Sequence, residues 1–273
     1  MKDNFIKSKK LRILEEKLNH LRQKFRDKND FKTVEAVFDS KTLLALYKLF
    51  NDGYLDILNG VISTGKEANV YWGVTPEGQD VAVKIYRIST LDFKNFLKYI
   101  EGDPRFLSIG KKIHTRIYLW AQKEFKNLTI AKKVGAHVPT PVTVYKNILI
   151  MEFIGENGLP APLLKDYLPK NPEKILEIVL SDIEKLYVKG HLVHADLSEY
   201  NILVHKEIPY IIDIAQGVNI QHPNALNFLV RDIRNILRFF REEAGIDVPD
   251  IADVFMKITG LNLYEFPDLC EDT

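Results

Sequence analysis

The spacing of apolar residues changes near residue 54, and this change constrains the fold more than any other feature of the chain. Before it, apolar residues recur every three or four positions, as they do along one face of an amphipathic helix. The first such face consists of Leu11, Leu14, Leu18, Leu21 and Phe25. After it, short apolar runs separated by turn residues continue to about residue 86, a pattern typical of antiparallel strands. We therefore expect an α+β fold that joins a β-rich part to helical parts.

Cap and turn signals refine this outline. The expected helices cover residues 40–50, 112–134, 172–189, 223–244 and 249–258, with Asp39 and Asn171 as N-caps of the first and third. The expected strands cover 58–62, 69–72 and 81–85, with turns at 63–66 and 76–79, a β segment that ends at 148–153, and two short strands within 191–214. Residues 87–110 are expected to form a mobile loop with a short helix at 90–100. These elements predict a helical extension at 1–53, a β-rich lobe at 54–151, and a connector with a helical lobe at 152–273.

Composition excludes several classes of protein. The single cysteine, Cys270, rules out an intrachain disulfide and a zinc site built on several thiolates. The start of the chain lacks the apolar stretch of a signal peptide, and no run approaches the roughly 20 apolar residues that a membrane helix needs. We therefore expect a cytoplasmic protein with no membrane and no zinc partner. Charge is uneven, because residues 1–32 contain 11 Lys or Arg and 5 Asp or Glu in a chain of net charge +1.

The strongest candidate for chemistry is the segment His194–Asn201, which reads His-Ala-Asp-Leu-Ser-Glu-Tyr-Asn. An aspartate and an asparagine five residues apart, after an apolar stretch and a histidine, have the spacing of a kinase catalytic loop. Asp196 would orient the substrate hydroxyl and Asn201 would bind a metal ion. Asp213 ends a short apolar strand, where a kinase places its second magnesium ligand. A turn with an Asx cap is the plainer reading of each residue alone, but their order favours phosphoryl transfer.

The turn within residues 63–71 has the strand–turn–strand setting of a loop that covers nucleotide phosphates. Its residues are Ser-Thr-Gly-Lys-Glu-Ala-Asn-Val-Tyr. Small residues at Ser63, Gly65 and Ala68, followed by Val70, occupy the positions of the kinase glycine pattern. Only one glycine of that pattern is present, so an ordinary hairpin is the plainer reading of this turn alone.

The same stretch also matches a different phosphate-binding loop. Gly60 and the pair Gly65-Lys66 have the spacing of the loop found in the other large class of nucleotide-binding proteins. That motif requires Ser or Thr next and then a helix, whereas Glu67 and a strand follow here. We therefore reject this interpretation.

Lys84 lies on the polar side of a predicted strand, from which a lysine can reach the phosphates of a nucleotide. Its expected partner is a glutamate on the next helix. Glu101 and Glu124 compete for that role, and we choose Glu124 because it lies within the strong helical pattern. A surface lysine and a solvated helix glutamate are the plainer readings.

Together, these motifs resemble the RIO family of atypical kinases, and the loop at 63–71 resembles its type-one branch. The resemblance covers about residues 40–260 and implies a bilobal protein-kinase-like fold that lacks the activation loop and the peptide-docking helices. Ala195 stands where the family more often has glycine, and where many kinases have an arginine that senses a phosphorylated activation loop. Ile214 and Ala215 replace the Phe-Gly that follows the metal-binding aspartate in other kinases, which is normal for this family.

The resemblance also implies roles for individual residues. It implies Asp196, Lys84 and Asp213 as catalytic residues, and Asn201 and Asp213 as ligands of Mg²⁺ or Mn²⁺. It implies ATP contacts from Ser63, Thr64, Gly65, Lys66, Glu67, Ala68, Val70, Lys84, Glu124, Met151, Glu152, Ile154, Glu199 and Asn201. In this set Met151 would guard the adenine pocket, and the backbone of Glu152 and Ile154 would bind adenine. In the related branch a phosphoaspartate forms at the metal-binding aspartate, which here is Asp213.

By the same resemblance we expect Ser/Thr phosphorylation, autophosphorylation, ATP hydrolysis and a role in late maturation of the small ribosomal subunit. The basic N-terminal helix could contact rRNA phosphates in a pre-small-subunit particle; packing of its leucine face on the kinase lobe is an equal alternative. Two other functions stay open. The chain could be a binding module that ATP switches with little turnover, or a small-molecule kinase of the aminoglycoside or choline type.

Overall fold

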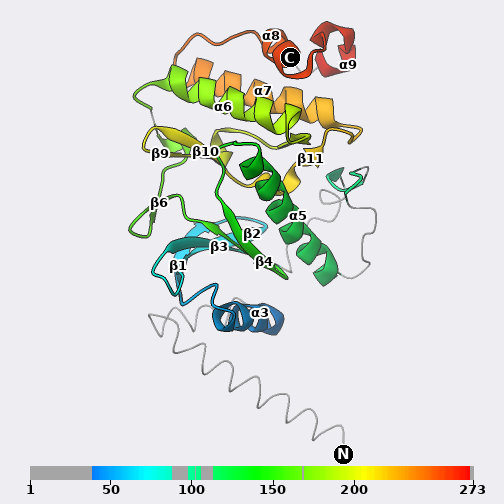
Figure 1. Ribbon diagram of the computed structural model, residues 1–273. Helices are drawn as coiled ribbons and strands as arrows, with labels where there is room; N and C mark the ends of the chain where they lie inside the picture. The colour runs from blue at the N-terminus through cyan, green and yellow to red at the C-terminus, as the bar shows by residue number, and fades with distance from the viewer. Residues whose placement is uncertain (1–38, 88–97, 102, 106–112, 168, 271–273) are drawn as a thin grey trace, which may run out of the picture. The chain divides into compact units, whose positions relative to one another are not determined.

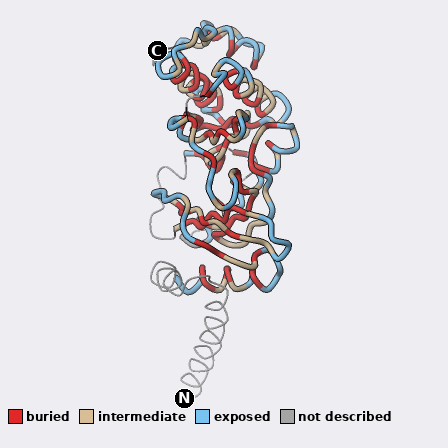
Figure 2. The backbone as a smooth tube through the Cα atoms, turned by 90° about the vertical axis from the view of Figure 1, so that its left-hand side faces the viewer, coloured by how far each residue is buried: buried red, intermediate tan, exposed pale blue. Residues whose placement is uncertain are grey.

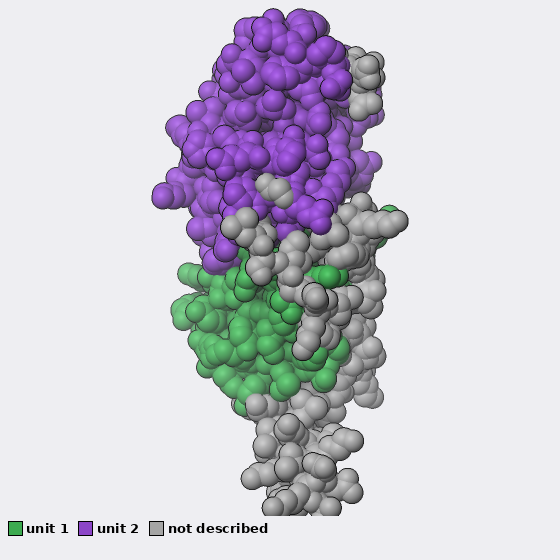
Figure 3. Space-filling view, turned by 90° about the vertical axis from the view of Figure 1, so that its right-hand side faces the viewer, with its two compact units in different colours: residues 1–90, 113–122, 142–153 green, residues 91–112, 123–141, 154–273 purple. Residues whose placement is uncertain are grey.

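The computed structural model describes residues 39–87, 98–101, 103–105, 113–167 and 169–270. The predicted helix at residues 11–25 and the predicted loop at 88–97 and 106–110 lie outside these ranges. The chain forms two compact units (Figure 3). Unit 1 comprises residues 1–90, 113–122 and 142–153, and unit 2 comprises residues 91–112, 123–141 and 154–273. The expected lobe boundaries, 54–151 and 152–273, are contiguous and stay predictions.

Unit 1 is built on an antiparallel sheet (Figure 1). Its strands are β1 (Ile57–Thr64), β2 (Ala68–Val74), β3 (Asp80–Tyr86), β4 (Pro141–Tyr145) and β5 (Ile148–Glu152), in the spatial order β1-β2-β3-β5-β4. Strand β3 lies at the centre, so Lys84 pairs with Val70 on one side and with Leu149 on the other. Alternation of side chains along β3 then fixes which residues share a face with Lys84.

Helix α3 (Ser40–Asn51) provides the apolar cover of this unit. Asp39 caps it, because its Oδ1 accepts hydrogen bonds from the backbone N–H groups of Lys41 and Thr42 at 2.8 and 2.9 Å. Leu43, Leu46 and Leu49 face inward with the helical period, as the sequence predicted, and they form one buried core with residues of β1, β2, β3 and β5 (Figure 2). The packing of α3 on the sheet therefore follows from its amphipathic pattern.

Unit 2 is mainly helical (Figure 1). Its longer helices are α6 (Pro172–Val188), α7 (Ala225–Glu242) and α8 (Ile251–Thr259), which pack against one another, and α9 (Pro267–Cys270) follows. Its short strands are β6 (Gly155–Glu156), β7 (Leu159–Pro160), β8 (Leu192–Val193), β9 (Ile202–His205), β10 (Ile208–Ile211) and β11 (Val218–Asn219). Its 3₁₀ turns are η1 (Leu164–Asp166), η2 (Glu199–Asn201), η3 (Ile214–Gln216) and η4 (Leu263–Glu265). Asn171 caps α6 by accepting from the N–H of Lys174 at 2.9 Å, as expected.

Helix α5 (Ile113–Lys133) agrees with the predicted helix at 112–134 and is shared by the two units. Only residues 214–224 separate Asp213 from α7, and they contain η3 and β11. So short a connection leaves no room for an activation loop, as the sequence predicted. Among the described residues, no helix is long and apolar enough to cross a membrane.

The structure corrects three local expectations. Ser63 and Thr64 belong to β1, where they pair with Val70 and Asn69, so the turn begins later than expected. Irregular register between Leu58 and Ser63 lets the strand continue into the predicted turn. Three strands rather than two lie within 191–214, and β8 pairs with β11. The short α9 was not expected, because four residues are too few to show a helical period.

Candidate active site

Asp196 lies in a loop of unit 2 that side-chain and backbone hydrogen bonds hold in place. The Nδ2 of Asn201 donates to the backbone C=O of Asp196 at 2.7 Å, which closes the loop across the predicted five-residue spacing. The Nε2 of Gln216 donates to Oδ2 of Asp196 at 3.0 Å. The bond from Asn201 therefore holds the backbone of Asp196, and the bond from Gln216 orients its carboxylate, which remains exposed at the surface of the unit.

Asp213 is tied to the same loop through the backbone. The N–H of Ile212 donates to the C=O of Asn201 at 2.9 Å, and Nε2 of His194 lies 3.1 Å from the C=O of Ile212. Asp213 itself has φ +58° and ψ +51°, in the left-handed region that aspartate tolerates better than most side chains. The backbone turns at Asp213, which is the N-cap of η3, and the Asp213 side chain is exposed.

Asp213 lies close enough to influence the ionisation of Asp196. The protein around the Asp196 carboxyl keeps part of the water away from it, which raises its pKa, and the negative charge of Asp213 raises this pKa further. Arg231, the hydrogen bond from Gln216, and Lys98 act in the opposite direction. The net pKa of Asp196 is raised above the ordinary aspartate value, which favours proton acceptance by this residue.

Asp232, which the sequence analysis missed, supports the loop from beneath. It lies on α7 with only 1% of its surface exposed, and its Oδ2 and Oδ1 accept from the N–H groups of Ala195 and Leu197 at 2.7 and 2.8 Å. These two residues flank Asp196. Arg231 donates to the C=O of Ala195, and Asn235 donates to the C=O of Leu197 at 3.1 Å. One turn and a half of α7 thus holds both sides of the Asp196 backbone.

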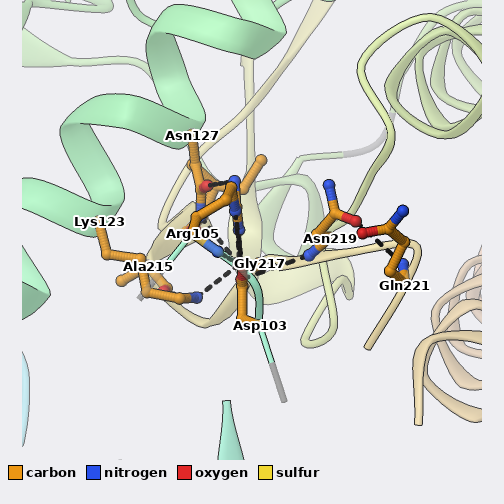
Figure 4. Close-up of polar contacts among 9 residues, drawn as sticks. Asp103, Arg105, Lys123, Asn127, Ala215, Gly217, Asn219 and Gln221 are labelled. Carbon is orange, nitrogen blue, oxygen red and sulfur yellow. Dashed lines mark hydrogen bonds and ion pairs between the residues drawn. The ribbon is translucent and has the colours of Figure 1, made fainter. Parts of the chain in front are cut away.

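A buried network fixes the segment that follows Asp213 (Figure 4). Lys123 of α5 is fully buried, and its Nζ donates to the C=O of Ala215 at 2.8 Å and to the C=O of Gly217. Asn127, one turn along α5, donates to the C=O of Ile214 at 2.8 Å and of Gly217 at 3.0 Å. Two consecutive turns of α5 therefore provide hydrogen-bond donors for the backbone C=O groups of Ile214, Ala215 and Gly217.

Arg105 joins this network from another segment of unit 2. It pairs with Asp103 at 2.6 Å and donates to Oδ1 of Asn127 at 2.8 Å (Figure 4). Burial acts to raise the pKa of Asp103, but the hydrogen bonds and charge of Arg105 outweigh it, so the pKa is lowered. Burial lowers the pKa of Lys123 well below its usual value; Arg105 adds to this effect and Asp103 opposes it.

We expect Lys123→Met to destabilise the protein by about 1–3 kcal/mol, because it leaves the buried C=O of Ala215 without this donor. Met has a similar length and no donor, so packing is largely kept. Urea unfolding of both proteins measures the difference. Lys133→Met, at an exposed position on the same helix, is the control. Equal stability of Lys123→Met and the wild type would contradict this role.

The predicted nucleotide-binding residues of unit 1 lie on its sheet and in the turn between β1 and β2. Lys84 has 6% of its surface exposed and places its Nζ 5.3 Å from the centre of the Tyr86 ring. Gly65 occupies a tight turn, since a Cβ atom there would lie 3.0 Å from the C=O of Ala68. Met151 pairs with Ala82 and Glu152 with Val81, so β5 brings both beside β3.

The other predicted nucleotide contacts belong to unit 2. Glu124 is fully buried on α5, Glu199 is buried and faces Arg238 at 3.4 Å, and the C=O of Ile154 accepts from the N–H of Ala161 at 2.9 Å. Lys84 belongs to unit 1 and Glu124 to unit 2, so their pairing stays a prediction. The same holds for any joint contact of the two sets with ATP.

The donor set at Asp213 suits a hard divalent cation. Asn201 commits its Nδ2 to the backbone of Asp196, which leaves its side-chain carbonyl oxygen as a ligand atom, and the carboxylate of Asp213 is exposed in the segment that bonds to the backbone of Asn201. Oxygen ligands of this kind are those that Mg²⁺ prefers, and Mg²⁺ usually takes only one or two protein carboxylates together with substrate phosphates. The described residues contain no group of three or more His, Cys, Asp or Glu that could hold a metal. Two protein oxygen ligands, one from Asn201 and one from Asp213, fit a cation that completes its coordination with the phosphates of a nucleotide.

Comparison with known proteins identifies the family. The sequence profile of the RIO domain matches residues 69–254. The chain belongs to the RIO family of atypical serine/threonine kinases. It is 43% identical to the RIO-type serine/threonine-protein kinase Rio1 of Haloferax volcanii over 248 residues, which are 91% of this chain and 81% of that protein. It is 38% identical to human serine/threonine-protein kinase RIO1 over 272 residues, covering 94% of this chain and 48% of that protein. The predicted RIO family is thus confirmed, and the relatives named Rio1 agree with the type-one branch.

Solved structures confirm the bilobal, kinase-like α+β fold of this RIO kinase. The crystal structure of Rio2 kinase from Chaetomium thermophilum has a TM-score of 0.63 at 23% identity, covering 80% of this chain and 67% of that one. The ADP/Mg²⁺–phosphoaspartate complex of the same Rio2 kinase has a TM-score of 0.60 at 21% identity, covering 84% and 73%. At these identities the likeness concerns the fold alone.

Proposed function

We propose that this RIO kinase transfers the terminal phosphate of ATP to serine or threonine hydroxyls of proteins, itself included, and that it also hydrolyses ATP. The observation that carries the proposal is the cluster of Asp196, Asn201 and Asp213 in unit 2. These residues provide a proton acceptor and two oxygen ligands in one place, in the arrangement that phosphoryl transfer requires.

Each residue of the site has its own role in phosphoryl transfer, which follows from its surroundings. Asp196, with its raised pKa, orients the acceptor hydroxyl and takes up its proton. The Oδ1 of Asn201 and the carboxylate of Asp213 would hold Mg²⁺ or Mn²⁺, and Lys84 would hold the phosphates of ATP. When bound, the metal–ATP complex supplies the phosphoryl group and neutralises its charge. Lys123 and Asn127 bond to the backbone of η3, the segment directly after Asp213. The position of Asp213 is therefore fixed through the backbone, although its side chain is exposed.

The cellular role that we propose is maturation of the small ribosomal subunit in the cytoplasm, with a pre-small-subunit particle as partner. The resemblance to the RIO family and the basic composition of residues 1–32 support it. The short connection between Asp213 and α7 also fits a kinase that recognises its target without a peptide-docking platform.

The test is Mg²⁺-dependent ATP turnover by the full chain, with and without small ribosomal subunits. We expect Asp213→Ala to lower turnover at least about 10²-fold, because it removes the carboxylate ligand of the metal, and we expect the subunits to stimulate the wild type. Asp253→Ala, on the exposed side of α8, should match the wild type. Tight ATP binding with turnover that Asp213→Ala leaves unchanged would instead favour the ATP-switched binding module.

A further inference from the structure

A cavity of about 430 Å³ lies in unit 2 along the N-terminal half of α7. Its lining includes three basic side chains, Lys98, Arg231 and Arg234, and two amide side chains, Asn224 and Asn227. The single carboxylate among the lining residues belongs to Asp268. The catalytic chemistry described above uses none of the space in this cavity, whose walls carry an excess of positive charge.

The ring of Phe228 positions two of the three cations. The Nζ of Lys98 lies 5.3 Å from the centre of this ring and Cζ of Arg231 lies 5.2 Å from it, both within the range of cation–π attraction. Tyr99 packs against the same ring, with 5.5 Å between ring centres. Two of the three cations, Lys98 and Arg231, therefore lie against one aromatic ring that contributes to their placement.

The charge of these cations is only partly compensated within the protein, where Arg231 acts on the nearby carboxylates of Asp196 and Asp232. Within the described part of the chain, no carboxylate lies at salt-bridge distance from Lys98, Arg231 or Arg234. Arg234 makes one long hydrogen bond, 3.4 Å to the C=O of Leu269. Three cations that share one cavity repel one another, and an anion between them would relieve that repulsion.

The cavity is linked directly to the catalytic loop. Arg231, one of its walls, donates to the C=O of Ala195, whose peptide group joins it to Asp196. Lys98 and Arg231 both act electrostatically on the Asp196 carboxylate. A group bound in the cavity would therefore belong to the same molecule that presents its hydroxyl to Asp196.

We propose that this cavity binds a phosphate or carboxylate group of the protein acceptor and so selects acidic or phosphorylated segments for phosphorylation. The inference rests on the proposed function, because it assigns the substrate class of that same site. A polypeptide fits better than RNA, since the cavity is one local patch whose lining includes Asp268. An RNA strand instead requires a basic groove that follows several consecutive phosphates.

Three acceptor peptides test the proposal. They share one serine in a neutral sequence and carry Asn, Asp or phosphoserine at the flanking positions. We expect wild-type kcat/KM to be about tenfold higher for each anionic peptide than for the neutral one, mainly through KM, since charge-assisted hydrogen bonds are the strong ones. Arg234→Gln should bring this ratio close to one while leaving KM for ATP unchanged. A larger ratio for phosphoserine than for Asp would identify phosphate as the preferred group, and both outcomes support the cavity.

Arg241→Gln is the matched control, because Arg241 lies on the same helix, is exposed and does not line the cavity. The proposal is overturned if the wild type shows no preference for anionic peptides, or if Arg241→Gln reduces the preference as much as Arg234→Gln. Melting temperatures of all variants, measured in parallel, show that each is folded during the assay.

A binding measurement separates failure of this proposal from failure of the proposed function. The fluorescein-labelled phosphoserine peptide is titrated with the full chain without ATP, and anisotropy reports binding. Binding that Arg234→Gln weakens supports the cavity even if no peptide is phosphorylated. Absence of binding, or displacement by a single-stranded RNA that itself requires Arg234, overturns the inference.

Discussion

Asp196→Asn is expected to lower the rate of phosphoryl transfer to protein by about 10²- to 10⁴-fold, the range that a positioned general base contributes. Asparagine has nearly the same shape and can still accept the hydrogen bond that Gln216 gives to Asp196, so the loop should stay folded. The substitution removes the ability to accept a proton together with the negative charge of the carboxylate. Single-turnover transfer from labelled ATP measures the rate. Equilibrium ATP binding should change by less than about twofold, because the substitution leaves the contacts that hold ATP in the ground state in place.

The pH dependence of this rate provides a second check. Because burial and Asp213 raise the pKa of Asp196, the active ionised form is lost as pH falls through a pKa above the ordinary aspartate value. Gln216→Leu removes a hydrogen bond that favours the ionised form, so it should move this acidic limb to higher pH. Asp253→Asn is the exposed control. An acidic limb that stays in place in Gln216→Leu, or an Asp196→Asn variant with more than about a tenth of wild-type activity, would contradict the role of Asp196 as the base.

Local signals allowed much of the fold to be predicted from the sequence. The caps at Asp39 and Asn171 and the apolar periods of α3, α5 and α6 depend on residues only a few positions apart. Pairings between distant segments were not visible. Strand β8 has two residues, and its partner, β11, lies beyond the intervening catalytic segment. No window of sequence contains both strands, so periodicity could not reveal them.

The candidate site shows the same division. Asp196, Asn201 and Asp213 follow one another at family spacing, and the structure brings them together. Asp232 and Lys123 support them from helices far along the chain, and no motif marks them. One signal was available for Asp232: it falls on the apolar face of α7, in step with Leu229, Ile233 and Ile236. A carboxylate in such a position is rarely buried unless it is bonded, and it could have been identified as structural or functional on that ground.

Asp232→Ala is expected to destabilise the protein by about 2–6 kcal/mol, because it leaves two buried N–H donors unsatisfied at about 1–3 kcal/mol each. These donors belong to Ala195 and Leu197, so the catalytic loop loses its support as well. In Asp232→Asn, which keeps the side-chain volume, we expect kcat to fall by about 10- to 100-fold through misplacement of Asp196. Hydrogen exchange at the amides of Ala195 and Leu197 should accelerate more than exchange on α7.

The stability of the wild type relative to Asp232→Asn should also depend on pH. Burial raises the pKa of Asp232 to about 7 from the ordinary 3.8, against the opposing hydrogen bonds from Leu197 and Ala195. The folded protein therefore holds a proton that the unfolded chain releases between these two values. The stabilisation from that proton is complete below the unfolded pKa and is lost as pH rises through 7; its size is on the order of 4 kcal/mol.

Urea unfolding of both proteins between pH 5 and 8 measures this difference, since asparagine does not titrate. The advantage of the wild type should shrink as pH rises toward 7 and then level off. An advantage that stays constant would mean that Asp232 is ionised throughout and that its two short hydrogen bonds outweigh burial. In either case, loss of activity in Asp232→Asn at a pH where both proteins are fully folded separates its action on Asp196 from its contribution to stability. If that variant kept full activity there, the Asp232 carboxylate would not be what positions the catalytic loop.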